Sequence, residues 1–85
     1  MKEFRYNIQD KEGIHARPAG IVVAEAKKYQ STVQIENKGK TADLKRIFGV
    51  MGLCVKHGEE VHVMVEGADE ELACQEIERV FKENL

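Results

Sequence analysis

The sequence predicts an α+β protein with the element order βαββαβα, folded as a two-layer sandwich of a mainly antiparallel sheet with helices on one face. Apolar and polar residues alternate, as in half-buried strands, over residues 4–8, 33–36 and 61–65. Apolar residues recur at helical spacing over residues 16–29 and 69–81. The helices are separated by hairpins and single strands rather than by strict strand–helix alternation, which favours an antiparallel sheet. Periodicity alone does not distinguish this sandwich from a ferredoxin-like domain.

The first predicted elements are a strand and a helix joined by a turn. In the strand, over residues 4–8, aromatic and aliphatic side chains alternate with Arg5 and Asn7, and segment 10–13 supplies the glycine-containing turn. A helix then runs from Ala16 to about Tyr29. Its expected inner face consists of Ala19, Val22, Val23, Ala26 and Tyr29.

The middle of the chain predicts a hairpin and a short helix. Val33 and Ile35 alternate with polar residues, and Asn37-Lys38-Gly39 marks a turn into a second short strand over residues 40–43. Segment 47–53 is apolar but contains two glycines, so we expect a helix of only one or two turns.

A strand over residues 61–65, lying between Gly58 and Gly67, and a final helix complete the order. Asp69 is expected to cap this helix, and the two glutamates that follow suit the positive end of its dipole. The expected inner face of the helix consists of Ala73, Ile77, Val80 and Phe81.

Composition limits both the size of the protein and its function. Eighty-five residues with 42% hydrophobic content allow one domain, residues 1–85, with one modest core. A net charge of −2 lacks the basic excess of a nucleic-acid binder, so we expect no nucleic-acid partner. The apolar stretches are too short to span a membrane and the N-terminus lacks a signal-peptide core, so we expect a cytoplasmic protein without membrane insertion.

The cysteines and histidines form no pattern of metal ligands. Cys54 and Cys74 are not spaced as a metal-binding pair, and both are interpreted as small buried hydrophobic residues in a reducing compartment. His57 and His62 are far from His15 in sequence, and no motif joins them to the cysteines as zinc ligands. We therefore expect neither a metal nor another cofactor.

The most informative segment is Gly13-Ile14-His15-Ala16-Arg17-Pro18-Ala19-Gly20, where a helix begins without a usual capping residue. Pro18 suits a first helical turn. The free backbone N–H groups of Ala16 and Arg17, together with the Arg17 guanidinium, favour an anion there. His15 is the candidate nucleophile, and its second ring nitrogen needs a partner that sets the tautomer. A lone histidine at a helix start is more often an exposed polar residue, so spacing alone leaves both interpretations open.

Residues 13–19 resemble the active-site signature of the histidine-containing phosphocarrier (HPr) family of the phosphoenolpyruvate-dependent sugar phosphotransferase system. Segments 37–40, 44–53 and 67–71 resemble later parts of the family in order and spacing, so the resemblance covers essentially the whole chain. It implies an open-faced sandwich of four strands with three helices on one side. It also implies that His15 carries a phosphoryl group on Nδ1, received from phosphorylated enzyme I and passed to the A component of a sugar permease. Such a protein is a carrier consumed and regenerated, rather than an enzyme with its own turnover.

The resemblance also assigns roles to residues around His15. Arg17 and the backbone of Ala16 would hold the phosphoryl oxygens. The segment around Phe48 has more apolar surface than so few turns can bury, so part of it is expected to face outward, where the family places its docking surface. The expected partners are enzyme I, the A components and regulatory proteins, and we expect a monomer. The residues assigned to the docking surface are Gly20, Ile21, Arg46, Ile47, Phe48 and Met51.

Two positions depart from the family pattern. Arg46 stands where many Gram-positive members carry a regulatory serine that a dedicated kinase phosphorylates, so that control is not carried over and the short helix loses its N-cap. Glu12 stands where members usually have a small hydroxyl or amide residue that can donate toward the phosphate. An ionised glutamate only accepts, so close to His15 it would repel the phosphoryl group and disfavour the phosphohistidine.

Two other functions remain open from the sequence. The same His15 chemistry could feed a nitrogen-related or regulatory relay, which the residues near His15 do not distinguish from sugar transport. The second open function is that of a binding domain in which His15 is never phosphorylated. A hydrolase that uses His15 as a base is not supported, because no serine, cysteine or paired carboxylate lies at a suitable spacing.

Overall fold

The structure is a computed structural model that describes residues 1–85. The four strands form one sheet in the order β1-β4-β2-β3, and every neighbouring pair is antiparallel. The predicted α+β fold and the order βαββαβα are both confirmed. The elements are β1 (Lys2–Asn7), α1 (Ala16–Ala26), β2 (Thr32–Asn37), β3 (Lys40–Asp43), α2 (Ile47–Gly52), β4 (Glu60–Glu66) and α3 (Glu70–Asn84).

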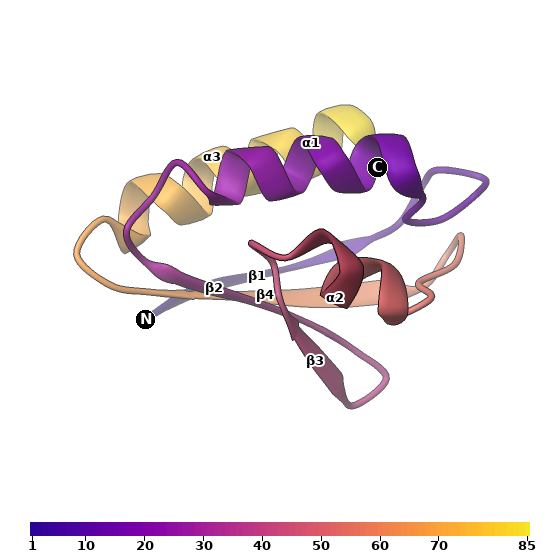
Figure 1. The fold of residues 1–85 in the computed structure, drawn as a ribbon, viewed down its shortest axis with the longest axis horizontal. Helices are drawn as coiled ribbons and strands as arrows, with labels where there is room; N and C mark the ends of the chain where they lie inside the picture. Colours follow the sequence, from indigo (N-terminus) through magenta and orange to yellow (C-terminus); the bar gives the residue numbers. More distant parts are fainter.

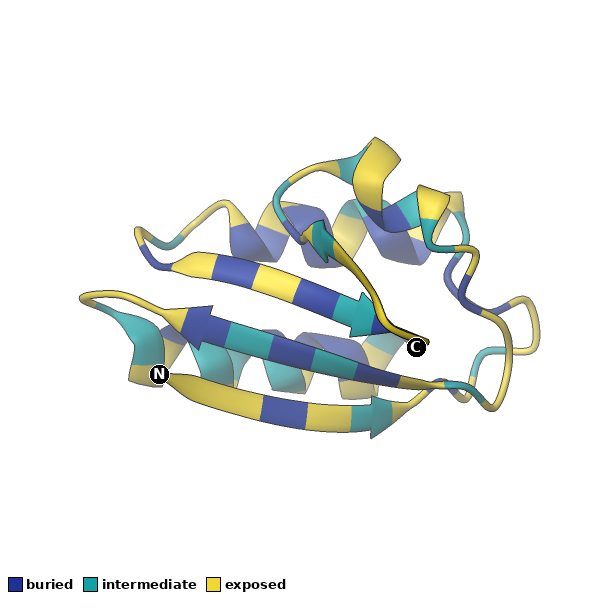
Figure 2. Ribbon diagram, turned by 90° about the horizontal axis from the view of Figure 1, so that it is seen from below, coloured by how far each residue is buried: buried dark blue, intermediate teal, exposed yellow.

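The helices cover one face of the sheet and leave the other face open. Helices α1 and α3 lie side by side across the sheet, and α2 packs against α1 and β3 at one edge (Figure 1). Figure 2 shows the open face, where buried and exposed residues alternate along the strands. The antiparallel register places apolar residues of neighbouring strands on the covered face, because Val63 of β4 pairs with Phe4 of β1 and with Ile35 of β2.

One hydrophobic core of 20 buried residues lies between the sheet and the helices. The alternating valines Val61, Val63 and Val65 of β4 are fully buried in it, as the strand period predicts. The predicted inner face of α3 is confirmed, since Ala73, Ile77, Val80 and Phe81 are all buried. None of the three helices combines the length and the apolar character that a membrane crossing requires.

Helix α1 ends at Ala26, earlier than its apolar spacing predicts. The backbone N–H groups of Lys28 and Tyr29 bond to the carbonyls of Glu25 and Ala26, which tightens the chain into a turn of the 3₁₀ type. Tyr29 packs against the core from this turn and donates its hydroxyl to the buried Glu25 carboxylate at 2.7 Å. Burial, reinforced by this hydrogen bond, raises the pKa of Tyr29 to about 12.

The predicted N-cap position of α3 is confirmed, but the expected capping hydrogen bond is absent. Asp69 occupies the N-cap position, but its side chain makes no capping hydrogen bond. Its carboxylate instead accepts the Ser31 hydroxyl and the backbone N–H groups of Gln30 and Ser31, and these bonds lower the pKa of Asp69. The close approach of Gly67, where a Cβ would lie 2.7 Å from Ser31 Cα, brings these loop donors to the carboxylate. Asp69 therefore ties the α1–β2 loop to the start of α3.

The interpretation of the cysteines as buried hydrophobic residues is wrong. Both are free thiols, and Cys54 is exposed while Cys74 is half-buried. Cys54 follows α2 with a φ of 53°, the left-handed conformation in which helices often end, and it lies at the surface. Cys74 packs against the core from α3, and this partial burial raises the pKa of its thiol.

Candidate functional site

The segment before His15 is a tight loop held against the connection between α2 and β4. Gly13 has a φ of 71°, and a Cβ at this position would lie 2.2 Å from the carbonyl oxygen of Val55. The Gly13 N–H donates to the carbonyl of Asp10 at 2.9 Å, and the Ile14 N–H donates to the carbonyl of Val55 at 3.0 Å. Only glycine combines this conformation with this close approach, and the loop thereby holds His15 at the start of α1.

Helix α1 begins without a side-chain cap, as the sequence predicts. His15 is the N-cap residue, and its ring makes no capping hydrogen bond. The backbone N–H groups of Ala16 and Arg17 have no acceptor in the protein, and Pro18, in the same turn, has no N–H. The Arg17 side chain is exposed and forms neither a hydrogen bond nor an ion pair. The first turn of the helix therefore carries two free backbone donors and one unpaired cation.

The ring of His15 is held by a carboxylate that the sequence analysis did not single out. Its Nε2 lies 3.2 Å from Oδ2 of Asp10, and its side chain is 33% exposed. Hydrogen bonds from the Glu12 backbone N–H and from His15 lower the pKa of Asp10, so this carboxylate is ionised near neutral pH. Because a carboxylate only accepts, Nε2 carries the proton, and in the neutral ring Nδ1 keeps its lone pair.

Asp10 and His57 are the site residues that sequence reasoning missed. Asp10 was assigned only to a turn, although an aspartate whose carboxylate accepts the N–H two residues on is a recognisable turn motif. The ring of His57 lies against the same loop, with Nδ1 3.3 Å from the carbonyl oxygen of Asp10. No sequence signal joins His57 to this loop, because the two segments meet only through the fold.

Glu12 is exposed, and its side chain makes no hydrogen bond or ion pair. Its contribution to the loop is its backbone N–H, which donates to Oδ1 of Asp10 at 2.8 Å. The acidic group in contact with the ring of His15 is therefore Asp10 rather than Glu12.

The expectation that part of the segment around Phe48 faces outward is confirmed. Phe48 on α2 is 88% exposed and Ile21 on α1 is 41% exposed, whereas Val50 is fully buried. The two helices meet at Gly20, where the Ile47 side chain lies 3.9 Å from the place that a Cβ of Gly20 would take, an ordinary van der Waals contact. We define the apolar patch as the exposed or half-buried residues along this α1–α2 contact, namely Gly20, Ile21, Ile47, Phe48 and Met51.

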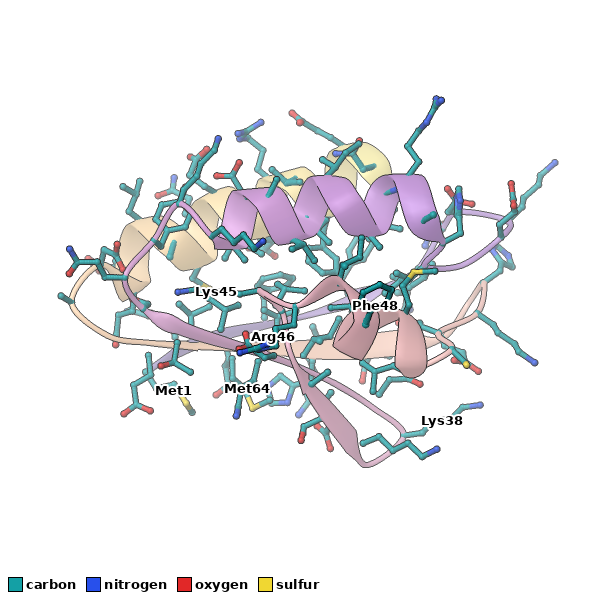
Figure 3. The ribbon with its side chains drawn as sticks, viewed as in Figure 1. Met1, Lys38, Lys45, Arg46, Phe48 and Met64 are labelled. Carbon is teal, nitrogen blue, oxygen red and sulfur yellow. The ribbon has the colours of Figure 1, made fainter.

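Basic side chains border the apolar patch beside Ile47 and Phe48, and Figure 3 labels Lys45, Arg46 and Phe48 in this region. Arg46 is the N-cap residue of α2, makes no capping bond, and is exposed, with its Nε 3.9 Å from the Asp43 carboxylate. The Lys45 ammonium donates to the backbone carbonyl of Tyr29 at 2.8 Å, so it is held near the end of α1 without a neutralising carboxylate. These side chains and Lys27 line a shallow cleft next to Phe48.

Comparisons with known proteins agree with this geometry. A family model described as the phosphorylation site of the HPr component of the phosphotransferase system (PTS) matches residues 2–83. The phosphocarrier protein HPr of Lysinibacillus sphaericus is 40% identical over 83 residues, which cover 98% of this chain and 94% of that protein.

Solved structures of related proteins share the fold over nearly the whole chain. HPr from Thermoanaerobacter tengcongensis has 37% identity and a TM-score of 0.94, covering 99% of this chain and 94% of that chain. The Bacillus subtilis catabolite repression protein Crh has 34% identity and a TM-score of 0.78, covering 100% of this chain and 98% of that chain. With the match of family model, sequence and fold, the chain belongs to the HPr family of phosphocarrier proteins of the PTS.

Proposed function

We propose that His15 accepts a phosphoryl group on Nδ1 from phosphorylated enzyme I and passes it to the A component of a sugar permease. The observation that carries the proposal is the free Nδ1 of a half-exposed histidine beside the unpartnered N–H groups of Ala16 and Arg17. Membership of the HPr family supports the choice of partners.

The chemistry requires in-line transfer and moderate stabilisation of charge. The Nδ1 lone pair forms a bond to phosphorus while the bond between phosphorus and its donor atom on enzyme I breaks, and the electron pair of that bond stays on the donor atom. Nε2 keeps its proton, so the phosphorylated ring carries a positive charge. The backbone N–H groups and the Arg17 guanidinium hold the phosphoryl oxygens. A carrier must also release the group, and a few donors on an exposed helix start stabilise it without trapping it.

The apolar patch and its basic border are the proposed docking surface for both partners. An exposed aromatic residue such as Phe48 can anchor in a partner pocket, while Arg46 and Lys45 attract acidic surfaces and raise the association rate. Arg46 has no hydroxyl group to phosphorylate, so we infer that docking is not switched off through this position.

Charging by enzyme I tests the proposal directly. The protein is incubated with enzyme I and phosphoenolpyruvate, and its intact mass is measured under non-acidic conditions. We expect a single phosphoryl adduct that acid removes, that is absent from His15→Ala, and that persists in His62→Gln, whose histidine lies on β4. A wild-type protein that stays unmodified would exclude the carrier function.

One alternative role within the family is a regulatory or nitrogen-related relay, and the similarity to the catabolite repression protein Crh supports its regulatory form. It would use the same His15 chemistry with a different acceptor. Comparing the rates at which the charged protein phosphorylates A components of sugar and nitrogen systems distinguishes the two. An unmodified but correctly folded protein would instead indicate a binding domain that is never phosphorylated.

A further inference from the structure

Asp10 is held in place by hydrogen bonds to its backbone from three directions. Its N–H donates to the carbonyl oxygen of Leu85 at 2.8 Å. Its carbonyl oxygen accepts the Gly13 N–H at 2.9 Å and lies 3.3 Å from Nδ1 of His57. Residues from three parts of the chain therefore fix the backbone of Asp10 in the loop that precedes α1.

The carboxylate of Asp10 is partnered at both oxygens. Oδ1 accepts the Glu12 N–H at 2.8 Å, which sets the rotation of the carboxylate within the loop. Oδ2 then lies 3.2 Å from Nε2 of His15. A carboxylate oriented in this way offers the ring one acceptor at a defined place, which is how enzymes hold a reacting imidazole in one tautomer.

We propose that Asp10 is a positioning residue for phosphotransfer, keeping the proton of His15 on Nε2 and the lone pair of Nδ1 available to phosphorus. This inference rests on the proposed function of His15. As the Nδ1–P bond forms and the bond from phosphorus to its donor atom on enzyme I breaks, no proton leaves Nε2, and the Asp10 carboxylate balances the positive charge of the ring. Arg17 follows two residues on in α1, and the ring of His57 contacts the backbone carbonyl of Asp10 and helps to lower the pKa of the Asp10 carboxyl.

Two substitutions separate this role from a merely structural one. In Asp10→Asn the amide oxygen can still accept the Glu12 N–H, so the amide NH₂ group faces Nε2 of His15. Nε2 must then accept, the proton moves to Nδ1, and the nucleophilic lone pair is lost. Asp10→Ala also removes the loop hydrogen bond to Glu12, but it leaves the ring free to adopt either tautomer. If Asp10 positions the ring, Asp10→Asn should slow charging more than Asp10→Ala. If Asp10 only stabilises the loop, Asp10→Ala should slow charging more.

The experiment compares single-turnover charging by phosphorylated enzyme I for the wild type, both Asp10 variants and Glu66→Gln. Glu66 is an exposed residue at the end of β4, so this control removes the same charge away from the ring. We expect Asp10→Asn to slow charging by about tenfold or more and Asp10→Ala by less, with the control unchanged. Nitrogen-15 NMR of the His15 ring should show Nε2–H in the wild type and Nδ1–H in Asp10→Asn.

The outcomes separate the two proposals. An uncharged wild-type protein defeats the carrier function itself. A charged wild type overturns the role of Asp10 if Asp10→Asn is charged equally fast, or if Asp10→Ala is slower than Asp10→Asn while both rings keep the Nε2–H tautomer. Urea denaturation of each variant establishes that the compared proteins are folded.

Discussion

Replacing Gly13 by alanine tests how the site loop is held in place. Gly13 has a φ of 71°, so the left-handed backbone costs an alanine about 1 kcal/mol. The added Cβ would lie 2.2 Å from the carbonyl oxygen of Val55 and 2.7 Å from Lys56 Cα, and because both are backbone atoms the loop must move away. The hydrogen bond from Ile14 to Val55 then breaks, which costs about 1 kcal/mol and about 1 kcal/mol more for groups left unpaired. We expect the free energy of unfolding to fall by about 3 kcal/mol in total.

Gly39→Ala is the matched control. Gly39 lies in the β2–β3 turn with a φ of 81°, and nothing lies within 4 Å of its added Cβ, so only the backbone strain of about 1 kcal/mol remains. Urea unfolding followed by circular dichroism gives both free energies, provided that the denaturant slopes agree. Gly13→Ala should also slow the charging of His15, because the displaced loop carries Asp10. If Gly13→Ala loses no more stability than Gly39→Ala, the close approach to Val55 is refuted.

Three further predictions concern docking, phosphoryl binding and acid stability. Phe48→Ala should weaken the binding of enzyme I, measured by calorimetry, without lowering the free energy of unfolding. Val50→Ala in the same helix should lower the free energy of unfolding by about 2 kcal/mol, because Val50 is fully buried. Equal losses of stability in the two variants would contradict this prediction. Arg17→Ala should slow transfer through His15 and leave the urea midpoint unchanged, and an unaltered transfer rate would remove Arg17 from the site. Because hydrogen bonds hold the pKa of Asp69 below its usual 3.8, its ionised form stabilises the fold at neutral pH, and this contribution is lost as the pH falls through the lowered pKa. Asp69→Asn should therefore be less stable than the wild type at pH 7, with the difference shrinking in acid; a difference independent of pH would argue against this linkage.

The order of elements could be predicted because each element shows its own periodicity. The valines of β4 alternate, and the apolar residues of α3 recur every three or four positions, so each buried face can be identified without knowing what covers it. The error at Asp69 arises because the partners of its side chain lie far away in the sequence. Aspartate is a typical N-cap residue, but the carboxylate of Asp69 accepts hydrogen bonds from Ser31 and Gln30 instead of from the first turn of α3.

The sequence by itself determined the uncapped start of α1, with His15 and Arg17 at it, because capping depends on residue types within one turn. It also indicated that the segment around Phe48 could not bury all of its apolar surface. Only the tertiary structure decided which carboxylate faces the ring, since the sequence points to Glu12 whereas the loop directs Asp10 inward. It likewise brought His57 to the same loop. The physical reason is that a local motif determines which backbone donors are free, whereas the tautomer of a ring depends on contacts that form when distant segments pack together.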